Sequence, residues 1–154
     1  MARVIALVLG LVFVALPGHA RQISAGDPDG LLTHLTSEGI QAQLTKDDYG
    51  DPKINVRQGG TVFSIYFYGC QDALACTSLQ FFVGYRTDGA WTIDQANAWN
   101  KERRYTRAYI SEEGSARLEM DLLSGTGGIS VPGFAEHYVM WVRNMVEFEE
   151  LIGW

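Results

Sequence analysis

Two cysteines, Cys70 and Cys76, are the side chains of this sequence best suited to chemistry. Five residues separate them, whereas redox-active dithiols typically follow a C-x-x-C pattern. We therefore predict an intramolecular disulfide with a structural role and no redox role. Closing so small a loop stabilises a fold by about 2 kcal/mol in the chain-entropy description.

Other residues that could act on a substrate or bind a metal are scattered. His34 and His137 stand alone, and an H-E-x-x-H zinc motif is absent. The acidic turn from Asp47 to Asp51 lacks the twelve-residue calcium loop and its final glutamate. Residues 125–128 are glycine-rich but lack the phosphate-loop lysine, and no G-x-S-x-G occurs. We expect no metal, no cofactor and no enzymatic activity, although a carboxylate pair for hydrolysis stays an open alternative.

Two stretches of β-type sequence, 61–70 and 76–86, can be paired in a single antiparallel register. Placing Cys70 opposite Cys76 also pairs apolar residues along one side, including Phe67 with Leu79. We expect the cysteines on the opposite side. That side also carries Tyr66, Tyr68, Gln80 and Phe82.

This tyrosine-rich side is a candidate partner surface. Tyrosines suit binding because they bury apolar area and still offer a hydroxyl group. The alternative is that the helix near Trp99 covers it, and both alternatives stay open at this point.

The longest predicted element is a C-terminal helix, which Ser130 caps and which runs to about Leu151. Its apolar residues recur at helical spacing, so most of them should pack on a sheet. They are Phe134, Tyr138, Trp141, Met145, Phe148 and Ile152, flanked by Ala135, Val139, Val142 and Val146. This stripe is wider than one sheet contact needs, which leaves room for a homodimer contact.

Shorter elements complete the domain. Asp29 can cap a helix over 30–38, and alternating apolar residues predict strands at 40–44 and 54–56. A further hairpin turns at 112–114 and should set Arg107 opposite Glu119.

Thr92 and Gln95 form the capping box of another helix. The residues expected on its buried side are Ile93, Ala96 and Trp99. The fold class predicted from these elements is α+β: an antiparallel sheet of two or three hairpins, with the long C-terminal helix packed on one face.

The N-terminus has the pattern of an export signal. Arg3 precedes an apolar run from Val4 to Leu16, and small residues up to Ala20 suit cleavage. A run of this length is too short to span a bilayer, although a retained membrane anchor is the alternative. We expect a signal peptide at 1–20, a flexible segment at 21–28 and one domain at 29–154. Cleavage after Ala20 would place the protein in the periplasm or outside the cell, with no stable membrane insertion.

The charge balance argues against binding to nucleic acid. Loss of Arg3 with the leader leaves 11 Lys and Arg against 18 Asp and Glu, a net charge of −7. A phosphate backbone would be repelled by such a surface.

Several short motifs resemble the YbjN-type domain family of bacterial sensory transduction regulators. They are G-C-x5-C-T-S-L-Q-F at 69–81, W-N-K-E-R-R-Y-T-R-A-Y at 99–109, L-E-M-D-L at 118–122 and F-E-E-L-I at 148–152. The resemblance covers essentially the whole predicted domain. It implies a fold similar to type III secretion chaperones, which tends to dimerise, and it supplies no established active site.

The second motif contains Trp99, Asn100, Arg104 and Tyr109, which we interpret first as structural residues. Trp99 should be buried, and Arg103 or Arg104 should meet a carboxylate such as Glu119 or Asp121. The expected function is a non-enzymatic periplasmic module that binds a protein partner in the envelope. A small envelope hydrolase and a purely structural envelope protein are the alternatives.

Overall fold

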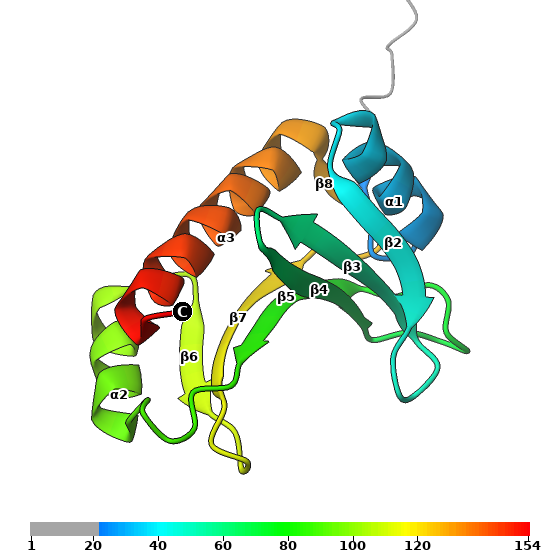
Figure 1. The fold of residues 1–154 in the computed structure, drawn as a ribbon. Helices are drawn as coiled ribbons and strands as arrows, with labels where there is room; N and C mark the ends of the chain where they lie inside the picture. The colour runs from blue at the N-terminus through cyan, green and yellow to red at the C-terminus, as the bar shows by residue number, and fades with distance from the viewer. Residues whose placement is uncertain (1–21) are drawn as a thin grey trace, which may run out of the picture.

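The computed structural model describes residues 22–154, so the predicted leader at 1–20 lies outside the described residues. Eight strands and three helices follow one another (Figure 1). The strands are β1 (Gln22–Ile23), β2 (Gln41–Lys46), β3 (Pro52–Gln58), β4 (Thr61–Tyr68), β5 (Ser78–Tyr85), β6 (Arg107–Ile110), β7 (Ala116–Leu123) and β8 (Ile129–Ser130). The helices are α1 (Pro28–Ser37), α2 (Ile93–Glu102) and α3 (Val131–Ile152).

Six strands form one antiparallel sheet in the order β2-β3-β4-β5-β7-β6, and β1 pairs separately with β8. The predicted register between β4 and β5 is confirmed, with Phe67 opposite Leu79 and Tyr66 opposite Gln80. Arg107 also lies opposite Glu119, as predicted. The α+β fold class is therefore confirmed.

Helix α3 crosses one face of the sheet and closes the core (Figure 1). Ser130 caps it as predicted, by accepting a hydrogen bond from the Gly133 amide. Trp141 is fully buried and contacts the rings of Phe63 and Phe81 from the sheet. Period-two alternation in the strands and a 3.6-residue period in the helix thus meet in a single apolar layer.

The N-terminal end of the domain differs from the prediction. Asp27, not Asp29, caps α1, because Pro28 suits the first helical position, where no amide hydrogen is needed. The segment expected to be flexible is packed: Ile23 and Ala25 are buried in the core. Gly128 makes this packing possible, since a Cβ there would lie 2.7 Å from the carbonyl oxygen of Ile23.

Helix α2 has the predicted capping box but not the full predicted buried side. Ala96 and Trp99 are buried, whereas Ile93 is 69% exposed. Ile93 is the first residue of the helix and lines an open hollow beside β6 rather than the core. Among the described helices, none is long and apolar enough to cross a membrane.

The Cys70–Cys76 disulfide is present, with the two Cα atoms 3.8 Å apart. Its expected position opposite the core side is wrong, because Cys76 is buried in the same core cluster as Phe67 and Leu79. The ladder of β4 and β5 ends before the bridge, and Gly69 then adopts a left-handed φ of 66°. The alternation of strand faces therefore does not extend to the cysteines.

Candidate functional site: the open sheet face

No helix within residues 22–154 covers the face of the sheet that carries Tyr66, Tyr68, Gln80 and Phe82. Helix α3 lies on the other side, and the contact between α2 and the sheet is at the edge strand β6 (Figure 1). Tyr68 is 45% exposed, and the other three residues are half-buried. The structure thus decides between the two alternatives left by the sequence, and we call this surface the open sheet face.

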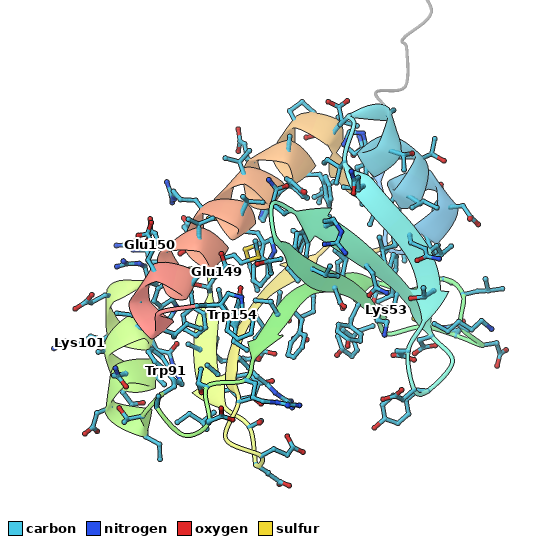
Figure 2. All side chains as sticks on the ribbon, viewed as in Figure 1. Lys53, Trp91, Lys101, Glu149, Glu150 and Trp154 are labelled. Atoms are coloured by element: carbon cyan, nitrogen blue, oxygen red, sulfur yellow. A yellow bond between two sulfur atoms is a disulfide. The ribbon has the colours of Figure 1, made fainter. Side chains whose placement is uncertain are left out.

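Two cations flank the aromatic rings at the centre of the open sheet face. The ring of Tyr66 packs edge-on against Phe82, with centroids 5.7 Å apart, and stacks on Tyr68 at 6.4 Å. The ammonium of Lys53 lies 5.6 Å from the centre of the Tyr66 ring, on the side of the sheet away from α3 (Figure 2). The guanidinium of Arg117 lies 5.7 Å from the centre of the Phe82 ring. Cation–π contacts of this kind hold both partners in place while leaving the cations accessible.

A network of polar groups borders these rings on β7 and β6. The Arg107 guanidinium donates to Glu119, whose residue is 7% exposed, and also approaches Asp121. Tyr109 donates its hydroxyl to the second carboxylate oxygen of Glu119 at 3.4 Å. The hydrogen bond to Glu119 raises the pKa of Arg107 above its usual value. Glu119 therefore holds the side chains of Arg107 and Tyr109 in place.

Hydrogen bonds also position the central polar residues. Gln80 donates to Asp121 at 2.8 Å, and the Tyr68 hydroxyl approaches Gln80 at 3.4 Å. Partial burial, followed by the proximity of Tyr66, raises the pKa of Tyr68. Its hydroxyl consequently stays protonated at neutral pH and can both donate and accept a hydrogen bond.

The face is hollowed between the β2–β3 turn and β6. One hollow of about 390 Å³ lies over the aromatic rings, and Tyr49, which is 94% exposed, stands at its rim. A larger hollow of about 740 Å³ lies beside β6 and shares Arg107, Tyr109 and Glu119 with the first. The two hollows therefore adjoin at these three residues.

Two cations on the outer row of β3 have no carboxylate partner among residues 22–154. Lys53 and Arg57 pair in register with Tyr66 and Val62, and neither forms an ion pair within the 4.0 Å limit. Arg107 and Arg117, by contrast, are each held by a carboxylate. Lys53 and Arg57 thus place two cations on β3 that are unpaired within residues 22–154, whereas Asp47 and Asp48 of the β2–β3 turn line the hollow over the aromatic rings. The open sheet face therefore carries charges of both signs.

The W-N-K-E-R-R-Y-T-R-A-Y motif mainly supports the fold. Trp99 is buried, donates its indole N–H to Thr106 and packs edge-on against Phe148. The side-chain amide of Asn100 donates to the carbonyl of Ala108 and accepts from its amide, at 2.9 and 2.8 Å. Asn100 therefore hydrogen-bonds to backbone groups on the outer edge of β6, in the way that a neighbouring strand would.

The arginines of this motif do not meet the expected carboxylates. Arg103 pairs with Glu147 on α3 at 3.1 Å and lies over the Trp99 ring, while Arg104 is exposed. Arg107 is the residue that reaches Glu119 and Asp121. The prediction failed because Arg103 ends the helix on the side of α3, whereas Arg107 lies on the strand itself.

Sequence reasoning did not assign Lys53 or Arg117 to the site, and it interpreted Tyr109 as a structural residue. Lys53 reaches Tyr66 through the pairing of β3 with β4, and Arg117 reaches Phe82 because β7 lies beside β5. The predicted residue Tyr109 does reach this face, through its hydroxyl, rather than serving the fold alone.

Residues 22–154 contain no group of three potential metal ligands. On the open sheet face, Glu119 and Asp121 both lie within ion-pair distance of Arg107.

Comparison with known proteins is consistent with this architecture. A model of the YbjN family, described as "Putative bacterial sensory transduction regulator", matches residues 27–153. Among curated proteins, none matches the chain. Because the match spans nearly the whole described domain, the chain belongs to the YbjN family.

Proposed function

We propose that the protein is a non-enzymatic regulatory module of the periplasm that binds a protein partner through its open sheet face. The observation that carries this proposal is the aromatic and cationic surface that none of the described helices covers. Tyrosine, phenylalanine and arginine are enriched where proteins bind one another. The family description as a sensory transduction regulator agrees with a binding role.

The chemistry of the face favours a particular kind of partner segment. The rings of Tyr66 and Phe82 offer apolar area, while Lys53 and Arg57 are cations without carboxylate partners in the described chain. A segment that presents an apolar or aromatic side chain beside a carboxylate would satisfy both features. We therefore propose an acidic–apolar protein segment as the ligand.

The segment would bind across the face rather than add a strand to β6. Asn100 already occupies the backbone groups of Ala108 on the outer edge of that strand. Strand addition needs such groups to be free. The larger hollow beside β6 can instead accommodate side chains of the partner.

The periplasmic location also belongs to this proposal. It is supported by the leader-like sequence at 1–20 and by the Cys70–Cys76 disulfide, which suits an oxidising compartment. Cell fractionation, with mass determination of the N-terminus, tests it. A mature chain that begins at Arg21 is the expected result, and an uncleaved chain in the membrane fraction would contradict it.

Site-specific photocrosslinking tests the binding surface. A photoreactive residue at Tyr68, which is 45% exposed, should capture a discrete protein in living cells. The matched control is Tyr105, which is 62% exposed but lies between α2 and β6, away from the open sheet face. Only the Tyr68 probe should give the product.

Substitution then shows whether the face itself binds. The double variant Tyr66→Ser with Phe82→Ser should abolish the Tyr68 crosslink, because it removes the two packed rings. Its thermal melting transition should stay cooperative, since both side chains lie outside the core cluster. Identical products from Tyr68 and Tyr105, or a crosslink that survives the double variant, would refute the proposal.

A further inference from the structure

Helix α3 carries a second apolar stripe that the sheet does not cover. Ala135, Val139, Val142 and Val146 recur at spacings of four, three and four residues along one side of the helix. Val139 is 66% exposed and Val146 is 43% exposed, whereas the core stripe of α3 is buried. Helix α3 lies at the outside of the molecule, with no described element on its outer flank (Figure 1).

The spacing of this outer stripe is that of a two-helix seam. Apolar residues that alternate at four and three residues occupy the a and d positions of a heptad. Taking Val139 and Val146 as a positions makes Ala135 and Val142 the d positions. An antiparallel copy of the same helix would then face Val139 with Val142, and Val146 with Ala135.

In the same antiparallel arrangement, charged residues beside the stripe of one copy would approach residues of opposite charge on the other copy. Glu136 and Arg143 occupy the two e positions, and both are exposed. Within the helix, Arg143 lies 4.0 Å from Glu147, a long contact that leaves other guanidinium N–H groups for a second carboxylate. In the antiparallel register, Glu136 of each copy lies within about 3 Å along the axis of Arg143 of the other, at 1.5 Å of rise per residue. A parallel pair would not bring these two residues together, because e positions then face g positions.

From these observations we infer that the protein forms a two-fold symmetric homodimer through the outer stripe of α3, with the two helices antiparallel. Glu136 of one copy pairs with Arg143 of the other, and the two-fold symmetry produces a second, equivalent pair at the other end of the contact. The occupant is a second copy because the seam complements its own apolar pattern and its own charges. The open sheet face stays free in this dimer, since it lies on the opposite side of the sheet.

The stripe is small, so the association should be weak to moderate, with a dissociation constant in the range of about 10 µM. Light scattering of the purified protein over a concentration series should show a monomer–dimer equilibrium. Val139→Arg should weaken it at least tenfold, because it places a cation in the seam. Leu151→Arg is the matched control: Leu151 is 51% exposed on the same helix but lies outside the stripe, and this variant should dimerise like the parent.

Charge reversal tests the orientation. Glu136→Arg alone should weaken the dimer roughly tenfold, because two attractive pairs become repulsive. Adding Arg143→Glu should restore it. Thermal melting of each variant confirms that the monomer is folded.

Cysteine pairing gives an independent readout of register. A mixture of the Val139→Cys and Val142→Cys variants should form disulfides mainly between unlike chains, whereas a parallel pair would link Val139→Cys chains to one another. A monomer at every concentration would overturn the inference. So would dimerisation that Val139→Arg leaves intact, failure of the double charge reversal to restore the dimer, or predominant linkage between like chains.

Discussion

Replacement of Asn100 by alanine tests how the sheet protects its β6 edge. The side-chain amide makes two hydrogen bonds to the backbone of Ala108, a residue that is only 2% exposed. Each such bond contributes about 1 kcal/mol. Leaving the shielded backbone groups without partners adds about 1 kcal/mol, while alanine recovers about 0.5 kcal/mol of helix propensity. We therefore expect the free energy of unfolding to fall by about 2–3 kcal/mol.

Urea denaturation monitored by tryptophan fluorescence measures this loss. Asn97→Ala is the matched control, because Asn97 is an exposed asparagine in the same helix, and its replacement should leave stability unchanged or slightly higher. Asn100→Asp should cost at least as much as Asn100→Ala, since a carboxylate oxygen would face the Ala108 carbonyl. The uncovered edge should also promote aggregation of Asn100→Ala. An Asn100→Ala protein as stable and soluble as the control would refute the reasoning.

The remaining predictions concern the core, the disulfide and the response to alkaline pH. Trp99→Ala should lower the free energy of unfolding by about 3–5 kcal/mol, because it removes a buried ring; a parent-like urea midpoint would contradict this. Mass spectrometry of the oxidised protein should show two protons fewer than the reduced chain and no alkylation of Cys70 or Cys76, and replacing both by serine should cost about 2 kcal/mol. Burial and the hydrogen bond to Glu149 raise the pKa of Tyr85, so the fold retains that proton where the unfolded chain loses it. The contribution of Tyr85 to the free energy of unfolding should thus be fully present below about pH 10 and decline above it. Tyr85→Phe should flatten that decline when the free energy of unfolding is measured against pH. An unchanged slope would exclude Tyr85 as its source.

The C-terminal end of α3 explains why Tyr85 is so well protected. Its hydroxyl donates to Glu149 at 2.9 Å, and Thr61 donates to the same carboxylate oxygen. The Trp154 ring packs against Tyr85 with a centroid distance of 5.0 Å, and Figure 2 shows Glu149 and Trp154 at this end of the helix. An unpaired phenolate in this place would face a carboxylate, which is why the neutral form is favoured.

Local pattern was sufficient for the elements whose partners are near in sequence. The β4–β5 register followed from period-two alternation, because a shift by one residue would have moved Phe67 and Leu79 out of the core. The caps of α2 and α3 followed from side chains that bond to amides three residues away. The cysteine pairing was predictable for the same reason of short separation, although its face was not, because Gly69 ends the regular strand.

Tertiary structure alone decided the composition and exposure of the candidate site. Lys53 meets Tyr66, and Arg117 meets Phe82, only because β3 and β7 flank the central hairpin on opposite sides. The sequence determined by itself that one hairpin side would be rich in tyrosine, since alternation assigns side chains to faces. Whether a helix covers that side depends on where α2 docks, and contacts between distant segments rather than local periodicity decide this. Docking of α2 at the β6 edge, with Asn100 bonded to Ala108, is what leaves the tyrosine-rich face open.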